Sequence, residues 1–373
     1  MTQFALPYFA FRDFPEGINQ QVEQALVQVA RGNQFILGEE VEAFEQELAA
    51  ALQTGTALGV GNGYDALVIA LKAAGVGAGD EVIVPANTFI ATVNAVVQAG
   101  AIPVLAEPDL HTCNLTAKAA SAALTAKTKA LIPVHLYGQA CEMDELMELA
   151  QQYNLTLIED FAQAQGASYR GKPVGSFGHI NATSFYPTKN LGALGDAGAV
   201  VTADADLAAF ARMYRNYGQE QKYHNSIIGI NSRLDTLQAA VLRVKLRHLP
   251  QLNQERQRLA QVYLKALQGI ADLILPVTAP DSTHVYHIFN IRTRRRDELK
   301  AWLSEQGIQT AVHYPVPVHL QEAYTFLGHQ RGSFPIAEEL AATSLSLPLF
   351  PGMTETEQQA VITSIQTFFR THG

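Results

Sequence analysis

The 373-residue chain has little of what several classes of protein require. It has two cysteines, Cys113 and Cys141, too few for a disulfide framework and without the spacing of a metal site, so a reducing cytoplasm is the expected setting. No run of about 18 apolar residues could span a membrane, and residues 1–14 are aromatic but lack the pattern of a signal peptide. We therefore expect a cytoplasmic protein with no metal centre and no membrane partner.

An excess of positive charge is also absent. The sequence has 26 Lys and Arg against 35 Asp and Glu, and its formal net charge is −9. A nucleic-acid or anionic-membrane surface needs clustered Lys and Arg. The one basic run, residues 292–296, is most simply a solvated loop after a strand. We expect no nucleic-acid partner.

The remaining composition is that of an ordinary globular protein. At 48% hydrophobic and 16% charged residues, the chain is long enough for two domains. We expect a large domain over residues 1–249 and a smaller C-terminal domain over residues 250–373. A helix from about Asp235 is expected to break near Pro250, because proline removes a helical hydrogen bond.

From about residue 55 to 205, short apolar runs alternate with helical patterns, which is typical of a wound α/β sheet. The expected strands are 57–60, 81–84, 102–105, 130–134, 156–158, 183–185 and 199–202. The expected helices are 64–74, 89–98, 115–124, 143–153 and 206–214, followed downstream by a strand at 284–292 and helices at 297–306 and 354–369. Such a sheet places ligands at the carboxyl ends of its strands.

Lys189 is the most informative residue of the chain. It follows an apolar, strand-like run, 182–186, and precedes a glycine-studded segment, 192–201. A lysine amine is a nucleophile only when neutral, so a catalytic lysine must be desolvated or lie near positive charge. Most lysines are exposed, and a solvated loop position is the alternative. The apolar surroundings favour a Schiff-base lysine.

Asp160 and Gln163 supply two further groups that pyridoxal phosphate would need. This cofactor requires a lysine for its aldehyde, an acid at its pyridine nitrogen and donors for its phosphate. Asp160 follows the strand-like run 155–159 and can keep the ring nitrogen protonated, although an ion-pair or capping role is the alternative. The amide of Gln163 can donate to the ring oxygen, unless it is a solvated loop residue.

A phosphate site is expected where the segment 59–67 links a strand to a helix. The backbone N–H groups of Gly63 and Tyr64 would point at an anion there. Tyr64 stands where a dinucleotide fingerprint has its last glycine, which disfavours a nicotinamide dehydrogenase. Ser184 can also bond the phosphate. Phe89, expected at a strand end, can stack on a flat cofactor or pack in the core.

Together these residues resemble the DegT/DnrJ-type sugar aminotransferases, a group of fold-type I pyridoxal-phosphate enzymes, over nearly the whole chain. Other family-like stretches are 36–41, 79–85, 133–139, 231–235, 312–315 and 346–349. The resemblance implies an α/β fold with a mostly parallel mixed central sheet flanked by helices and a smaller C-terminal α/β domain.

The resemblance also implies roles for individual residues. Lys189 forms the Schiff base, Asp160 holds the pyridine nitrogen, Gln163 holds the ring oxygen, and Ser184 binds the phosphate with the Gly63–Tyr64 amides. Asn231 would reach the phosphate in the neighbouring subunit, so a homodimer with shared active sites is expected. The residues that match the sugar and nucleotide pocket are Tyr186, Tyr223, His224, His313 and Tyr314. Arg31 and Arg233 are candidates for the amino donor's carboxylate or the sugar diphosphate.

The implied reaction is a ping-pong transfer of an amino group from glutamate to carbon 3 of a nucleotide-linked, dTDP-type 3-keto-6-deoxyhexose, in deoxyaminosugar biosynthesis. Lysine at position 189 favours transamination, because relatives that dehydrate sugars have histidine there. The stretch 184–196 resembles the members that aminate carbon 3. The alternatives are amination at carbon 4 and a non-catalytic regulatory protein that binds pyridoxal phosphate or a nucleotide sugar.

Overall fold

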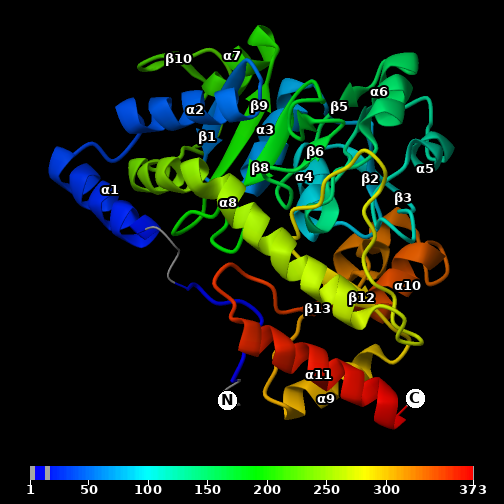
Figure 1. Ribbon diagram of the computed structural model, residues 1–373. Coiled ribbons are helices and arrows are strands. Elements are labelled where there is room, and N and C mark those ends of the chain that lie inside the picture. Colours follow the sequence, from blue (N-terminus) through cyan, green and yellow to red (C-terminus); the bar gives the residue numbers. More distant parts are fainter. Residues whose placement is uncertain (1–4, 13–16, 373) are drawn as a thin grey trace.

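The computed structural model describes residues 5–12 and 17–372, and its centre is an α/β layer (Figure 1). Four parallel strands are ordered β3-β2-β4-β5, with the bounds β2 Glu81–Pro85, β3 Ile102–Ala106, β4 Thr128–Leu131 and β5 Thr156–Leu157. A further group is ordered β1-β9-β8 with antiparallel pairs, and its bounds are β1 Thr56–Val60, β8 Asn181–Ser184 and β9 Gly198–Thr202.

Asp160 joins these two groups of strands into one sheet. It forms parallel bridges with Val134, beyond β4, and with Ala182 on β8. The Asp160 N–H donates to the Pro133 carbonyl at 3.0 Å, and the Phe161 N–H donates to the Ala182 carbonyl at 3.0 Å. The combined order is β3-β2-β4-β5-β8-β9-β1, with β9 antiparallel to its neighbours, which confirms the expected mixed and mostly parallel sheet.

Both faces of this sheet are buried. Val82 and Val84 belong to one apolar cluster and Ile83 to another, as expected because successive strand side chains point to opposite faces. The helices that cover the sheet are α3 (Gly63–Ala73), α4 (Ile90–Gln98), α5 (Ala117–Ala122), α6 (Met143–Gln152) and α7 (Ala205–Tyr214). Asn62 and Asp204 cap α3 and α7 by accepting backbone N–H groups. The buried faces explain why short apolar runs predicted these strands.

Local boundaries differ from the sequence expectations in several places. The expected strand 130–134 is β4, which begins and ends earlier, at Thr128 and Leu131. The expected strand 183–185 begins at Asn181 and ends at Ser184, and the expected helix 115–124 is shorter. Phe89 has an extended backbone and caps α4 instead of lying within it. Of the expected strand 284–292 only β12, Phe289–Arg292, is a strand.

The helix break expected near Pro250 is wrong. Helix α8 is continuous from Thr236 to Leu267 and contains Pro250. A proline inside a helix costs roughly 3 kcal/mol, but α8 packs against α1 (Ile18–Gly32) and α2 (Glu39–Ala51) with one end and α11 (Glu355–His372) with the other. Figure 1 shows α8 passing from the sheet to the C-terminal elements. The division at residues 249 and 250 falls inside this helix and stays a prediction.

The C-terminal part of the chain has its own apolar cluster, which includes Phe289, Phe350 and Ile365. This cluster is built from β12, β13 (Ser344–Leu347), α9 (Arg296–Glu305), α11 and the end of α8, whereas α10 (Pro335–Thr343) packs into the apolar cluster of the sheet through Ala337 and Leu340. The N-terminal segment 5–12 joins the C-terminal cluster through a parallel bridge between Leu6 and Ile308. The smaller elements are β6 (Ser168–Tyr169), β7 (Lys172–Pro173), β10 (Gln219–Gln221), β11 (His224–Asn225), η2 (Leu136–Gly138), η3 (Val318–Leu320) and η4 (Glu322–Leu327). Within residues 5–12 and 17–372, no helix has the length and apolar character to span a membrane.

Candidate active site

Lys189 lies in a closed turn between β8 and β9. Its backbone N–H donates to the Tyr186 carbonyl at 2.8 Å. A Cβ atom at Gly192 would lie 2.2 Å from the Pro187 carbonyl oxygen, so only glycine fits this turn. Burial lowers the pKa of Lys189 to about 8, and the charge of Asp160 opposes that change. The amine is therefore neutral at a lower pH than that of an exposed lysine, as a nucleophile requires.

The Asp160 carboxylate is 7% exposed and is held by two donors. The Thr92 hydroxyl donates to Oδ2 at 2.8 Å, and the Ala162 N–H donates to Oδ1 at 3.2 Å. Burial raises the pKa of Asp160, whereas Thr92, Ala162 and the charge of Lys189 lower it. Each of the two side chains changes the pKa of the other through its charge, so Asp160 lies within electrostatic reach of Lys189. The contact of Thr92 on α4 with Asp160 was not predicted from the sequence. The Thr92 hydroxyl also contacts the hydroxyl of Thr88, four residues earlier, at 2.9 Å.

Gly63 and Ser184, the expected phosphate contacts, lie against each other. A Cβ atom at Gly63 would be 2.4 Å from the Ser184 Cβ, so a larger residue at position 63 would displace the serine. Gly63 begins α3, and the N–H groups of Gly63 and Tyr64 belong to the first turn, which has no intrahelical acceptors. A hydroxyl and a helix N-terminus thus meet where β1 and β8 end, which is a suitable cradle for a phosphate.

Aromatic and amide groups complete this part of the site. The Gln163 amide donates to the Tyr314 hydroxyl at 3.1 Å and accepts the Tyr137 N–H at 2.7 Å. Phe89 is 48% exposed, and its ring centroid is 5.2 Å from that of Tyr314, so it does not have the core position that was the alternative. His313 Nδ1 contacts the Ser346 hydroxyl at 2.8 Å, and burial lowers the pKa of His313 to about 4, so this imidazole is neutral near pH 7.

Two residues near Lys189 and His313 were not predicted from the sequence to belong to the site. Tyr8 comes from the N-terminal segment, and its ring centroid lies 5.7 Å from that of His313. His287 has a buried Nδ1 atom without a partner among the described residues, and burial with the nearby charge of Lys189 lowers its pKa. The aromatic character of residues 1–14 was the only signal for Tyr8, and His287 had none.

The other expected pocket residues are mostly exposed. Tyr223 is 81% exposed and Tyr186 is 53% exposed, and Arg31, His224 and Asn231 are also exposed. Arg233 is part-buried: it donates to Asn216 Oδ1 at 3.0 Å, and its guanidinium lies 5.6 Å from the Tyr217 ring centroid. Within the described part of a single chain, the backbone hydrogen bond between Lys189 and Tyr186 is the one hydrogen bond or ring contact that joins these residues to Lys189 or Asp160.

The donor set around Lys189 fits pyridoxal phosphate. It provides an amine with a lowered pKa, a buried carboxylate, a side-chain amide, an exposed aromatic face and a phosphate cradle that has no room for a Cβ atom at position 63. Among residues 5–12 and 17–372 there is no group of three His, Cys, Asp or Glu side chains that could hold a metal ion.

Comparison with known proteins decides the family. The sequence model of the DegT/DnrJ/EryC1/StrS aminotransferase family matches residues 16–366. The chain belongs to this family. Its members depend on pyridoxal phosphate, so this aminotransferase uses the same cofactor, and the resemblance found in the sequence is confirmed.

Individual relatives of this aminotransferase align over almost its full length. A dTDP-3-amino-3,4,6-trideoxy-alpha-D-glucose transaminase from Streptomyces venezuelae is 46% identical over 361 residues, which cover 97% of this chain and 95% of the relative. A protein named pleiotropic regulatory protein from Geobacillus stearothermophilus is 45% identical over 357 residues, covering 95% and 96%. The crystal structure of S. venezuelae DesV in complex with a ketimine intermediate has a TM-score of 0.93, 47% identity and 95% coverage of both chains.

Replacing Gly63 with Ala should weaken cofactor binding by about 5- to 150-fold, since the new methyl group forces Ser184 away from the cradle and overpacking of this kind costs about 1–3 kcal/mol. Titration of the apo-protein with pyridoxal phosphate measures this affinity. Gly77→Ala is the matched control, because a Cβ atom at Gly77 meets nothing within 4 Å. Equal affinities for the two variants would exclude the Gly63–Ser184 cradle.

The attachment of pyridoxal phosphate to the apo-protein should quicken as the pH rises and level off above about pH 8. Only the neutral amine reacts, and burial lowers the pKa of Lys189 to about 8. Asp160→Asn should move the inflection to lower pH, since the carboxylate charge raises the lysine pKa. Stopped-flow absorbance measures the rate, and an inflection near pH 10 would contradict the burial of this amine.

Proposed function

We propose that this aminotransferase moves an amino group from glutamate to carbon 3 of a dTDP-linked 3-keto-6-deoxyhexose in deoxyaminosugar biosynthesis. The observation that carries the proposal is the amine of Lys189, whose pKa burial lowers to about 8 within electrostatic reach of Asp160, in a chain that is 46% identical to a transaminase named for a dTDP-3-amino sugar. A lysine at this position supports amine transfer over dehydration. The two buried free cysteines, Cys113 and Cys141, suit the cytoplasmic location that we also propose.

The residues divide the work of the reaction between them. When bound, pyridoxal phosphate supplies an electron sink that allows a proton to leave the carbon bearing the amine. Lys189 moves that proton between the substrate carbon and the cofactor carbon, a general acid/base role that requires hydrogen-bond reach to both. Asp160 keeps the pyridine nitrogen protonated, and Ser184 with the first turn of α3 holds the phosphate. Gln163, hydrogen-bonded to Tyr314, would donate to the cofactor's ring oxygen.

Aromatic residues near Lys189 and two arginines farther along the surface are the candidates for substrate contacts. Tyr8, His313 and Tyr314 offer flat faces and neutral hydrogen-bonding groups, which suit a deoxysugar with few hydroxyls. Arg31 and Arg233 are the candidates for the donor carboxylate or the diphosphate. Guanidinium groups form paired hydrogen bonds with both kinds of anion.

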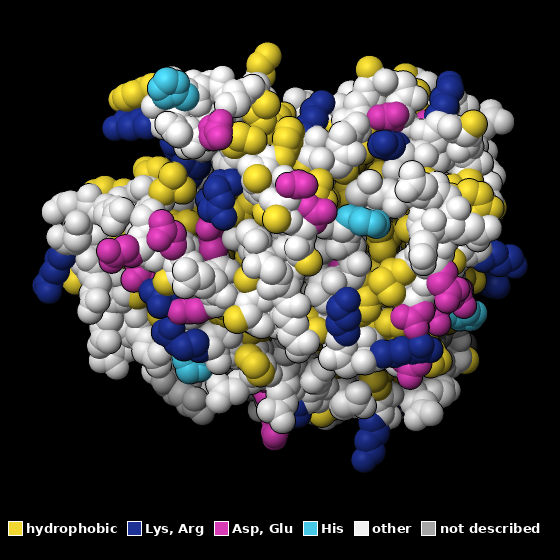
Figure 2. Space-filling model, turned by 90° about the horizontal axis from the view of Figure 1, so that it is seen from above, with side chains coloured by type: hydrophobic (Ala, Val, Ile, Leu, Met, Phe, Trp, Pro, Cys, Tyr) yellow, Lys and Arg dark blue, Asp and Glu magenta, His cyan; other side chains and the backbone are white. Residues whose placement is uncertain are grey.

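We further infer a homodimer in which Asn231 reaches the phosphate bound by the neighbouring protomer. Exposed apolar side chains near Asn231 support this arrangement, since Tyr223 is 81% exposed, Ile228 95% and Ile36 48%. Clustered exposed apolar groups mark interaction surfaces. On the face seen in Figure 2, hydrophobic side chains lie exposed between acidic and basic ones, as at a partly polar contact surface.

Product analysis tests the substrate. The purified protein is incubated with pyridoxal phosphate, glutamate and dTDP-linked 3-keto and 4-keto 6-deoxyhexoses, and NMR locates the new amine. We expect an amine at carbon 3, and none with Lys189→Ala, which lacks the group that moves the proton. An amine at carbon 4 alone would overturn the proposed position of amination, and no turnover with any amino donor would favour the regulatory alternative.

Mixed dimers test the shared site. Lys189→Ala and Asn231→Asp chains should each be nearly inactive, whereas a heterodimer of the two should regain about half of the wild-type activity. One of its two sites then has an intact lysine from one protomer and an intact asparagine from its partner. Tandem affinity tags isolate the heterodimer. Continued inactivity would show that Asn231 serves its own protomer's site.

A further inference from the structure

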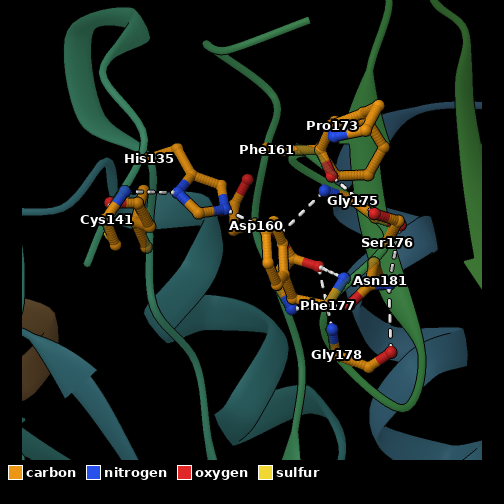
Figure 3. Close-up of polar contacts among 12 residues, drawn as sticks. His135, Cys141, Asp160, Phe161, Pro173, Gly175, Ser176, Phe177, Gly178 and Asn181 are labelled. Carbon is orange, nitrogen blue, oxygen red and sulfur yellow. Dashed lines mark hydrogen bonds and ion pairs between the residues drawn. The ribbon is translucent and has the colours of Figure 1, made fainter. Parts of the chain in front are cut away.

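Glu159, the residue before Asp160, is a carboxylate enclosed by protein, and its side chain is 0% exposed. Its Oε2 accepts hydrogen bonds from His135 Nε2 at 2.9 Å and the Gly175 N–H at 2.8 Å. Its Oε1 accepts from the N–H groups of Phe177 at 2.6 Å and Gly178 at 2.9 Å. Figure 3 shows these donors arranged around the strand end that carries Asp160. Two donors at each oxygen match the acceptor capacity of an ionised carboxylate and leave no place for a proton.

His135 contacts Glu159 through its imidazole and the Asp160 segment through its backbone. Its Nδ1 accepts the Cys141 N–H at 3.0 Å, so the ring proton is on Nε2 and is donated to Glu159 (Figure 3). The backbone N–H of His135 donates to the Asp160 carbonyl at 3.0 Å. The segment after β4 is therefore held to the segment after β5 by one side-chain bond and one backbone bond.

The loop 175–178 is pressed against the same strand end. A Cβ atom at Gly175, where φ is +87°, would lie 2.8 Å from the Phe161 ring, and one at Gly178 would lie 2.7 Å from the Leu157 carbonyl oxygen. Asn181 at the start of β8 accepts the Glu159 N–H at 3.0 Å and donates to the Gly175 carbonyl at 2.8 Å. This loop leads into β8, which ends at Ser184 and continues to the turn of Lys189.

We propose that Glu159, supported by His135, is a positioning residue that fixes Asp160 relative to Ser184 and Lys189. Its carboxylate ties together the segment after β4, the strand end of Asp160 and the loop before β8, without contact to the cofactor or substrate. The inference rests on the proposed role of Asp160 at the pyridine nitrogen. Neighbouring side chains on a strand point to opposite faces, so Glu159 holds the strand from behind while Asp160 faces the cofactor.

A glutamine cannot replace Glu159 without loss. In one orientation of the glutamine amide, the NH₂ group would take the place of Oε1 and face the N–H groups of Phe177 and Gly178. In the other orientation it would take the place of Oε2 and face the Gly175 N–H and the donor nitrogen of His135. The imidazole of His135 already accepts a hydrogen bond at Nδ1, so its proton is on Nε2 and His135 cannot accept a hydrogen bond from the new NH₂ group. Buried donors left unpaired in this way are costly, and the strand end must shift to relieve them.

The test titrates the absorbance of bound pyridoxal phosphate against pH in four holoenzymes: wild type, Asp160→Asn, Glu159→Gln and the double variant. Loss of the proton at the pyridine nitrogen makes the nitrogen that links the cofactor to Lys189 more basic. Asp160→Asn should therefore raise the chromophore's pKa by about 1 unit or more. Glu159→Gln should raise it in the same direction by a smaller amount, and should add nothing when Asp160 is already Asn.

Two further variants separate positioning from stability. Glu159→Asp keeps the charge and should restore part of the wild-type titration. Glu45→Gln is the matched control, because Glu45 is also buried, accepts the Gly59 N–H at 2.8 Å and pairs with Arg215 at 2.5 Å. It should lower the thermal midpoint while leaving the chromophore's pKa unchanged.

The outcomes distinguish this inference from the proposed role of Asp160. No pKa shift in Asp160→Asn would overturn that role and, with it, the positioning by Glu159. A shift in Asp160→Asn with a wild-type titration in Glu159→Gln would overturn the positioning alone. If Glu159→Gln does not fold, His135→Leu removes one of the four donors and should shift the titration in the same direction. An unchanged titration in that variant would equally overturn the positioning.

Discussion

The structure depends on the backbone pairing of Asp160 with strand segments on both of its sides. Its bridges to Val134 and Ala182 join the parallel group β3-β2-β4-β5 to the group β1-β9-β8, which carries Ser184. The same residue places its carboxylate at the carboxyl edge of the sheet, where ligands of wound α/β folds bind. The backbone of this one residue joins the sheet, and its side chain supplies the carboxylate of the proposed site.

Burial acts in opposite directions on the charged groups near this point. It favours the neutral amine of Lys189 and opposes the ionised form of Asp160, and each residue's charge partly offsets the effect on the other. Two donors to the Asp160 carboxylate oppose the effect of burial on its pKa. Four donors surround the Glu159 carboxylate. Among residues 5–12 and 17–372, no comparable set of acceptors surrounds the Lys189 amine, and burial lowers its pKa.

The sequence predicted the strands and much of the proposed cofactor site. The reason is that the carboxyl ends of parallel strands lie at the same edge of a sheet, whatever the path of the chain between the strands. This logic brought together Lys189, Asp160 and the Gly63–Ser184 cradle. It failed for Pro250, where packing along both ends of α8 outweighs the local cost of proline. It also missed Thr92, Tyr8 and His287, which enter through tertiary contacts with segments far away in the chain. The backbone donors of loop 175–178 carry no residue-type signal at all.

The continuity of α8 has a consequence for motion between the sheet and the C-terminal elements. A helix of 32 residues is about 48 Å long, and it is anchored near the sheet by α1 and α2 and near the C-terminus by α11. With no break at Pro250, it acts as a rigid strut that sets the spacing between the sheet and the strand pair beside His313. This strut therefore resists a hinge motion between the sheet and the C-terminal elements.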